Sequence, residues 1–329
     1  MASSDPRASD GLAASGALPA PQLGVWSFHT LPTGGTDGTA SSVLAHLTAR
    51  FPQVDETTWV SRMSRGWVRW DDGEPITPTT SFVAGRRLAY VKEVEDEPEP
   101  DGDVRVVYRD DRIAVLDKPT GIPVTPSGRY VRRSLLHQAR LRLDHPAPTP
   151  AHRIDRDTAG LVLFVLAPED RARYQGLFAS RRVHKVYEAW GRGTAEPPAF
   201  VTLRSQIERD DDGFRWSTGP LFGPSKVPSG SGRARMRGLS VTDVYRAEGL
   251  SDGVWRFRVV PETGRPHQIR LHLAALGFPI VGDPLYPSRR SVPASDGPLR
   301  LLAKELRFRD PDSGSWRVFE SSRRLPPLV

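Results

Sequence analysis

The chain has 329 residues, 38% of them hydrophobic, so it can bury a sizeable core and form one large domain and a smaller one. Lys and Arg number 46 against 39 Asp and Glu, and the resulting net charge of +7 suits a polyanionic partner. The sequence has no cysteine, which excludes disulfides, thiolate metal sites and cysteine nucleophiles.

The N-terminal 23 residues are rich in Ala, Ser, Gly, Pro and Asp and predict a disordered tail. They lack the continuous apolar core of a signal peptide, and no run in the chain approaches the length that spans a membrane. Together with the missing cysteines, these features lead us to expect a cytoplasmic protein with no membrane partner.

Residues 24–94 predict a small α/β domain. A serine-capped apolar pattern indicates a helix over 41–50, Asp55 caps a second over 55–64, and short strands are expected at 66–70 and 85–88. The arginines of this segment suit either a phosphate-contacting face or a solvated helix surface: Arg50, Arg62, Arg65 and Arg69. The acidic, proline-containing residues 95–103 predict a linker to a domain spanning 104–329.

The second domain opens with two predicted strands within 104–117 and a helix over 134–143. The stretch AHRIDRDTAGLVLFVL (151–166) then joins a charged loop to an apolar strand expected to be buried on both faces. Within the loop, Arg153 and Arg156 flank Asp155 and favour its ionised form, so this carboxylate could act as a nucleophile or base. An ordinary salt-bridged loop contains the same residue types, and spacing alone leaves both interpretations open.

Further along, a helix is expected over 168–182, and a strand over 183–190 places Lys185 and Tyr187 on one face. The polar residues 208–237 predict a long loop or hairpin insertion. Three alternating arginines there suit either an RNA groove or an exposed strand edge: Arg233, Arg235 and Arg237.

The C-terminal part predicts a strand over 255–260, a helix from Pro266 to Leu276 and a closing hairpin that turns at 310–314. On the helix, Arg270 lies about 100° from the apolar stripe and is expected to flank the core. His267 and His272 are five residues apart, a poor spacing for metal ligands, so no metal site is expected.

Four stretches in this order resemble the RluA-type family of RNA pseudouridine synthases. HRIDRDTAG followed by LVLF resembles the family's HRLD-x-x-TSG-LLLF signature, and the others are LDKPTGIPVTPS (116–127), VHKVYEAWGRG (183–193) and GRPHQIRLHLAALGFPIVGDPLY (264–286). The sequence departs from the family at Ala159, where serine is usual, at Pro266, where threonine is usual, and at Leu302, where histidine is usual. The helix–helix–strand pattern of 24–94 also resembles an S4 RNA-binding module.

The resemblance implies an α+β catalytic domain on a mixed, mainly antiparallel sheet. It implies isomerisation of specific uridines in ribosomal or transfer RNA, with the target base flipped out and no cofactor. Asp155 would be the catalytic carboxylate, Arg270 would pair with it and keep it ionised, and Tyr187 would stack on the uracil. The expected RNA contacts are His152, Arg153, Lys118, Lys185, Arg265 and His267.

Two other functions stay open at this point. One is a catalytically inactive RNA-binding protein on the same fold. The other is an aspartate-dependent hydrolase such as a glycosidase, which needs a second carboxylate about 5 to 9.5 Å from the first. Asp157 is the nearest acid in sequence, and a capping or salt-bridging role explains it more simply. We expect a monomer.

Overall fold

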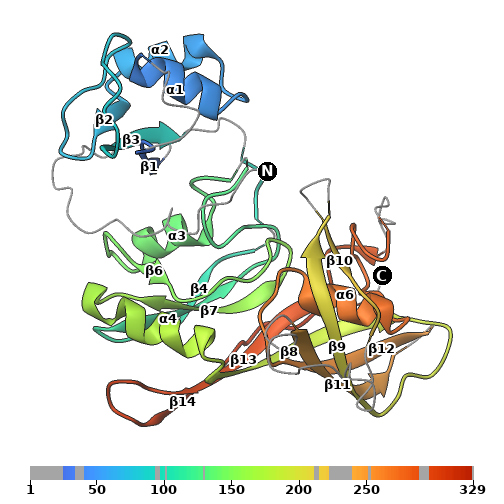
Figure 1. Ribbon diagram of the computed structural model, residues 1–329. Coiled ribbons are helices and arrows are strands. Elements are labelled where there is room, and N and C mark those ends of the chain that lie inside the picture. Colours follow the sequence, from blue (N-terminus) through green and yellow to red (C-terminus); the bar gives the residue numbers. More distant parts are fainter. Residues whose placement is uncertain are drawn as a thin grey trace, which may run out of the picture. The chain divides into compact units, whose positions relative to one another are not determined.

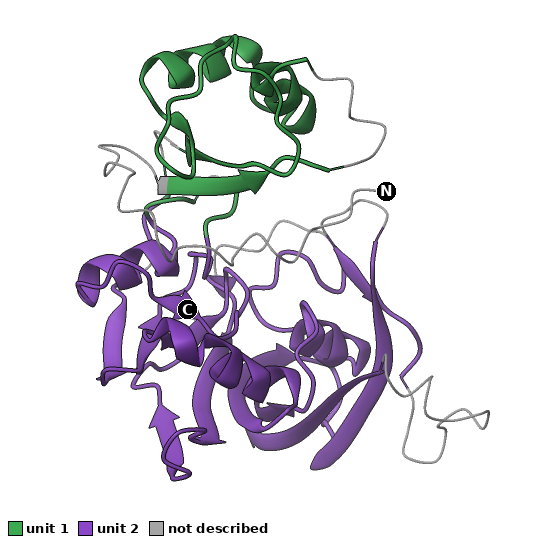
Figure 2. Cartoon of the chain, turned by 60° about the vertical axis from the view of Figure 1, so that its left-hand side comes forward, with its two compact units in different colours: residues 1–98, 126–132 green, residues 99–125, 133–329 purple. Residues whose placement is uncertain are grey.

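The computed structural model describes residues 25–33, 41–92, 97–100, 102–128, 130–210, 215–221, 239–250, 253–288 and 296–327. The chain divides into two compact units (Figure 2). Unit 1 takes its described residues from 1–98 and 126–132, and unit 2 takes them from 99–125 and 133–329. No helix among these residues is long and apolar enough to cross a membrane.

Unit 1 packs two helices against a three-stranded antiparallel sheet of order β1-β3-β2. Ser42 and Asp55 cap the two helices through their side chains, as the sequence predicts for Asp55. Strand β1 was not predicted, because its alternation is weak and its side chains are only half-buried or exposed. The elements are β1 (Val25–Thr30), α1 (Val43–Arg50), α2 (Glu56–Ser64), β2 (Val68–Trp70) and β3 (Arg87–Lys92).

The four arginines singled out in this unit all contact residues of the unit itself. The guanidinium of Arg50 lies over Phe51, and that of Arg65 lies over Trp67. Arg62 is buried with its guanidinium over Trp59, and Arg69 donates to the carbonyl oxygens of Gly66 and Gly73. In the acidic stretch, the buried Glu97 accepts hydrogen bonds from the backbone N–H groups of Val131 and Arg132, so this residue is not a solvated linker side chain.

Unit 2 is built on an 11-stranded sheet with the strand order β10-β9-β11-β12-β8-β13-β7-β5-β4, and β14 and β6 pair with β13 and β7 (Figure 1). Among the described strands, β13 and β7 form the one parallel pair. The predicted mixed, mainly antiparallel α+β fold is confirmed. Its strands are β4 (Arg105–Arg109), β5 (Ile113–Lys118), β6 (Thr149–Pro150), β7 (Ala159–Val165), β8 (Val183–Arg192), β9 (Phe200–Arg209), β10 (Trp216–Thr218), β11 (Leu239–Gly249), β12 (Val254–Pro261), β13 (Leu301–Arg309) and β14 (Trp316–Glu320).

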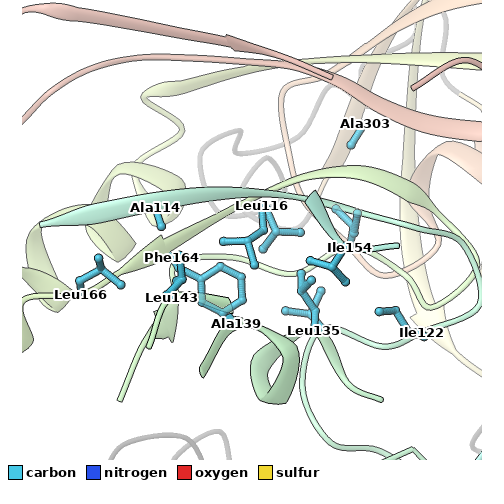
Figure 3. Packing of buried hydrophobic residues seen from close by; sticks show 13 residues of the cluster. Ala114, Leu116, Ile122, Leu135, Ala139, Leu143, Ile154, Phe164, Leu166 and Ala303 are labelled. Carbon is cyan, nitrogen blue, oxygen red and sulfur yellow. The ribbon is translucent and has the colours of Figure 1, made fainter. Parts of the chain in front are cut away.

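Two helices of unit 2 cover both faces of the sheet at β5 and β7, where nearly every residue is buried. On one side of β5 and β7, α3 (Leu135–Arg142) packs Leu135 and Ala139 against Leu116 and Phe164 (Figure 3). On the other side, a short 3-10 turn (Pro168–Asp170) leads into α4 (Arg171–Ala179), which contributes to a second apolar cluster. Strand β7 is therefore buried on both faces, as predicted.

The third helix, α6 (Gln268–Ala275), packs on the half of the sheet formed by β8, β9, β11 and β12. Its apolar stripe includes Ile269 and Leu273, which are buried as the sequence predicts. The partly buried Tyr187 contacts both this cluster and the cluster beneath α3. The boundary between the two halves of the core therefore lies at Tyr187.

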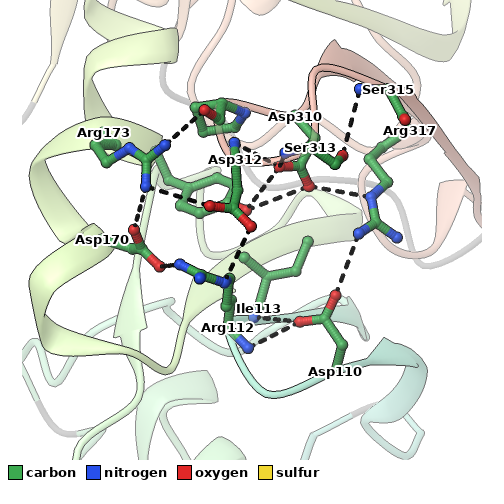
Figure 4. Close-up of polar contacts among 12 residues, drawn as sticks. Asp110, Arg112, Ile113, Asp170, Arg173, Asp310, Asp312, Ser313, Ser315 and Arg317 are labelled. Carbon is green, nitrogen blue, oxygen red and sulfur yellow. Dashed lines mark hydrogen bonds and ion pairs between the residues drawn. The ribbon is translucent and has the colours of Figure 1, made fainter.

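Buried ion pairs tie three turns of unit 2 together (Figure 4). The carboxylate of Asp170, at the start of α4, accepts from Arg112 after β4 (2.6 Å) and from Arg173 in α4 (2.8 Å). In the β13–β14 hairpin, Asp310 accepts from Arg317 at 3.0 Å. Each of these carboxylates is almost completely buried and is paired with at least one arginine. We therefore assign this cluster a structural role.

Gly160 sits where β7 approaches β13 most closely. Its φ is +114°, and a Cβ added there would lie 2.3 Å from the carbonyl oxygen of Ala303. We expect Gly160→Ala to lower the free energy of unfolding by about 2 to 4 kcal/mol, because it combines backbone strain with overpacking. Urea denaturation would measure the loss. Gly176→Ala in α4 is the control, since its Cβ would meet nothing within 4 Å. Equal stabilities of the two variants would contradict the argument.

Two sets of predictions fall on residues that the structure does not describe. One set concerns the N-terminal tail, residues 1–23. The other concerns most of the insertion 208–237, including Arg233, Arg235 and Arg237. The described part of that insertion contributes to the short β9–β10 hairpin. Both predictions remain expectations.

Candidate functional site

A pocket of about 440 Å³ opens in unit 2, and residues from six segments line it. These segments are the loop 152–158, the C-terminal end of α4 with Arg181 after it, the start of β8, the turn 261–265, the start of α6 and the start of β13. The three proposed catalytic residues all lie on its wall, as do all but one of the predicted RNA contacts. The predicted residues found there are Asp155, Tyr187, Arg270, His152, Arg153, Lys185, Arg265 and His267.

Asp155 has a cation beside it, but not one of the two that flank it in sequence. Arg270 Nη1 lies 3.8 Å from Asp155 Oδ2, and the Asp155 side chain remains 26% exposed toward the pocket. Arg156 instead forms a 2.8 Å ion pair with Asp157, which therefore has the salt-bridging role predicted for it. The cation beside Asp155 therefore comes from a helix distant in sequence.

Asp283, which the sequence analysis did not single out, lies closer to Arg270 than Asp155 does. The Nε and Nη2 of Arg270 donate to the two carboxylate oxygens of Asp283 at 2.8 and 2.6 Å, and both residues are almost fully buried. Burial opposes the charge of Arg270, but the hydrogen bonds to Asp283 and its negative charge raise the Arg270 pKa. Arg270 thus lies inside the core, which corrects the expectation that it flanks it. The sequence signal for Asp283 was the GDPLY stretch.

Tyr187 projects into the pocket from β8. Burial raises the pKa of its phenol, and the negative charge of Asp155 raises it further. At neutral pH the hydroxyl therefore stays protonated. This ring can offer an apolar face to a base and an O–H donor beside Asp155.

His152 braces the loop that carries Asp155. Its Nε2 accepts a hydrogen bond from the Leu163 backbone N–H at 3.2 Å, and its ring stacks on Phe178 with 4.3 Å between centroids. Burial, with the charge of Lys185, lowers the His152 pKa to about 3. The imidazole is therefore neutral at physiological pH, which limits it to hydrogen bonding and stacking.

Lys185 and Arg265 both line the pocket near the turn that follows β12. Lys185 Nζ donates to the Thr263 carbonyl oxygen at 3.1 Å, and burial and the nearby Arg181 lower its pKa to about 8. Arg265 is exposed at the rim of the pocket, as is Arg153. These side chains give the entrance a positive charge.

Gln268 holds this turn in place and was also overlooked. Its Oε1 accepts from the Thr263 hydroxyl (2.7 Å) and the Arg265 backbone N–H (3.1 Å), while its Nε2 donates to the carbonyl oxygen of Val241 in β11 at 2.9 Å. A buried side chain amide with every bond used is a rigid support. The glutamine of the HQIR motif was the available signal.

His267 begins α6 in a left-handed conformation with φ of +54°. Its Nδ1 lies 2.8 Å from the hydroxyl of Tyr286, and burial lowers its pKa. The second histidine of the helix, His272, is buried away from the pocket between Ser205 and Thr242. Among the described residues, no group of three His, Asp or Glu side chains gathers as a metal site would require.

Lys118 is the predicted RNA contact that the structure contradicts. Its side chain is fully buried, and Nζ donates to the carbonyl oxygens of Pro119, Ile122 and Arg156. Burial lowers its pKa to about 7 although Asp157 and Asp155 act to raise it. A fully buried amine cannot reach a phosphate, and Lys118 instead ties its own loop to the loop that carries Asp155.

Comparison with known proteins agrees with this geometry. A family profile described as RNA pseudouridylate synthase matches residues 112–275. The dual-specificity RNA pseudouridine synthase RluA of Vibrio cholerae is 34% identical over 220 residues, covering 67% of this chain and 82% of that protein. The ribosomal large subunit pseudouridine synthase D of Pseudomonas aeruginosa is 28% identical over 245 residues, covering 69% of each chain.

A solved human structure, RNA pseudouridylate synthase domain containing 1, superimposes with a TM-score of 0.52 at 26% identity and covers 69% of this chain and 86% of its own. Among the described residues, the other acid on the pocket wall is the exposed Glu262. The chain belongs to the RluA-type family of RNA pseudouridine synthases, which are isomerases that act on uridines in RNA.

Proposed function

We propose that this protein converts specific uridines of ribosomal or transfer RNA to pseudouridine and that Asp155 is its catalytic carboxylate. The observation that carries the proposal is the shared pocket: Asp155, Arg270 and Tyr187 come from three separate elements and line one cavity. The ribosomal and transfer RNA targets are suggested by the printed names of relatives and await direct test. The presence of all three groups in one pocket argues against an inactive RNA-binding protein.

The reaction breaks the bond between ribose C1′ and uracil N1, turns the base and joins C1′ to C5. The proton on C5 leaves to solvent and N1 takes up a proton in its place, so atoms and electrons balance without a cofactor. Asp155 either adds to C1′ or removes a sugar proton, and both routes need its ionised form. Arg270 beside it favours that form, since a nearby positive charge stabilises a carboxylate.

A uracil stacked in a helix cannot reach Asp155, so the target nucleotide must be flipped out. The pocket volume of about 440 Å³ suits one nucleotide, and Tyr187 supplies a face on which the uracil would stack. Arg153, Lys185 and Arg265 line the same pocket and would contact the neighbouring phosphates. We also propose that unit 1 is an S4-like module that binds RNA.

Tyr187 could stack on the uracil, and its hydroxyl could take part in the C5 proton transfer. Substitution separates these two roles. Stacking of a base on an aromatic ring contributes about 1 to 3 kcal/mol, so Tyr187→Ala should lose about 10- to 100-fold in rate. Tyr187→Phe keeps the ring, and we expect its rate to stay within a few-fold of wild type because the hydroxyl remains protonated. Tritium release from RNA labelled at uridine C5 would report the rates. A Phe variant as slow as the Ala variant would show that the hydroxyl takes part in the C5 proton transfer.

The activity itself is tested with RNA from a strain that lacks this gene. Total RNA is treated with a pseudouridine-specific carbodiimide, and reverse-transcription stops are compared with those of the parent strain. We expect at least one stop to be missing, to return with the wild-type gene and to stay absent with Asp155→Ala. Full restoration by Asp155→Ala would overturn the assigned role, and an unchanged set of stops would overturn the activity.

Three further expectations accompany this proposal. We expect the protein to act as a monomer. The cysteine-free sequence is compatible with the cytoplasm, where its RNA substrates would be found. Because phosphate contacts release counterions, RNA affinity should fall steeply as salt is raised.

A further inference from the structure

Arg270 shares its guanidinium very unequally between two carboxylates. Nε and Nη2 form hydrogen bonds of 2.8 and 2.6 Å with Asp283, whereas Nη1 lies 3.8 Å from Asp155, beyond hydrogen-bond distance. One edge of the guanidinium is thus bound in the two-point manner typical of strong arginine–carboxylate pairs. Asp155 therefore lies close to the positive charge of Arg270 but forms no hydrogen bond with it.

Asp283 keeps its position independently of the pocket. It is fully buried, and its Oδ1 also accepts hydrogen bonds from the backbone N–H groups of Leu285 (2.8 Å) and Tyr286 (3.2 Å). The ring of Tyr286 lies 5.2 Å from the Arg270 guanidinium, and its hydroxyl is held by His267 and by the Trp216 backbone N–H. Asp283 and Tyr286 therefore hold the guanidinium of Arg270 in one position.

We propose that Asp283 is a positioning residue that prevents Arg270 from binding Asp155 through two hydrogen bonds, and that it thereby keeps the Asp155 oxygens free to react with the sugar. The proposal rests on the function proposed above. A two-point bond from arginine would hold the reactive carboxylate in its ground state and oppose its movement toward the ribose. Held by Asp283, Arg270 stabilises the charge of Asp155 and leaves the carboxylate mobile.

Asp283 also offsets part of the positive charge that Asp155 experiences. In the proposed variant Asp283→Asn, the amide oxygen can still accept from Leu285 and Tyr286. The amide NH2 cannot accept from Arg270 Nε as Oδ2 does, and the side chain no longer neutralises Arg270. The ionised form of Asp155 then becomes more stable and is lost only at lower pH. The other ionisable groups on the elements packed around Asp155 and Arg270 are unchanged in this variant: Lys118, Arg153, Asp157, Lys185, Tyr187, Glu262, Arg265, His267 and Tyr286.

The test compares wild type and Asp283→Asn over a range of pH, with tritium release from RNA that carries uridine labelled at C5. We expect kcat to fall about 10- to 100-fold with KM nearly unchanged, because the effect is on the reacting carboxylate and not on binding. The acid limb of the pH–rate profile should move down by about one pH unit. A purely structural role would instead lower activity by the same factor at every pH.

Asp117→Asn is the matched control. Asp117 is as deeply buried as Asp283, it accepts from Arg323 Nε at 2.9 Å, and neither Asp117 nor Arg323 lines the pocket. This variant also removes a carboxylate from a buried arginine pair, so its loss of stability should be similar. It should leave the acid limb unmoved. The proposal would be overturned if the acid limb of the pH–rate profile did not move in Asp283→Asn. It would also be overturned if the limb moved equally in Asp283→Asn and Asp117→Asn.

A second measurement keeps this inference separate from the proposed activity. Carbon-13 NMR of the aspartate carboxyl groups follows the titration of Asp155 without RNA, with the signal assigned by its absence in Asp155→Asn. We expect the midpoint to move to lower pH in Asp283→Asn but not in Asp117→Asn. If wild type releases no tritium, the proposed function fails, whereas an unmoved NMR midpoint would contradict the role of Asp283 whether or not the protein is active.

Discussion

Replacing Asp155 with asparagine is expected to reduce pseudouridine formation by at least about 1000-fold, the largest effect of any single change in the pocket. Asparagine has nearly the same shape but cannot carry the negative charge that either route at the ribose needs. The side chain forms no short hydrogen bond within the described residues and is partly exposed, so the fold should be retained. Single-turnover tritium release would measure the rate, and thermal unfolding would verify the fold.

Asp157→Asn is a suitable comparison, because it changes the neighbouring acid, which pairs with Arg156. Surface pairs of this kind contribute about 0 to 1 kcal/mol, so we expect nearly normal stability and only a modest loss of rate. An Asp157→Asn variant as inactive as Asp155→Asn would mean that the wrong carboxylate has been assigned the catalytic role.

Replacing Arg270 with methionine is expected to destabilise the protein by about 3 to 5 kcal/mol, because it leaves the buried Asp283 without its guanidinium. The variant should also lose activity, since Asp155 would lack the cation beside it. Urea denaturation and tritium release would measure the two losses separately.

The double variant Arg270→Met, Asp283→Leu separates fold from chemistry. Replacing a buried ion pair with apolar side chains of similar size is often neutral, so we expect most of the stability to return. The activity should not return, because the charge near Asp155 is still missing. Stability that stays low in the double variant would point to the backbone bonds of Asp283 as the main loss, and a recovered rate would contradict the role of Arg270.

The local elements were predictable because their causes are local. Leu161 to Leu166 are continuously apolar, and the strand they form is covered by α3 on one side and α4 on the other. Side chain caps such as Asp55, and the alternation that puts Lys185 and Tyr187 on one face of β8, were equally visible. The pocket residues followed from the family motifs, and their placement on one wall agrees with those motifs.

Residue spacing alone did not reveal which distant residues become partners. The family motif implied that Arg270 pairs with Asp155, whereas spacing pointed only to Arg153 and Arg156. Neither identified Asp283, in a turn beyond α6, as the closest partner of Arg270. Lys118 was misjudged for a similar reason. A lysine is normally exposed, and only the folded loops bring three carbonyl oxygens around its amine.

The bond from Lys118 to the Arg156 carbonyl oxygen joins two loops that lie on either side of α3 in the chain. A newly made polypeptide must therefore complete that helix, and later α6 and the turn at Asp283, before the reactive carboxylate is surrounded. Contacts of such long sequence separation form slowly. A truncated or half-folded chain would therefore lack the complete pocket around Asp155, so we expect partial proteolysis to abolish the proposed turnover.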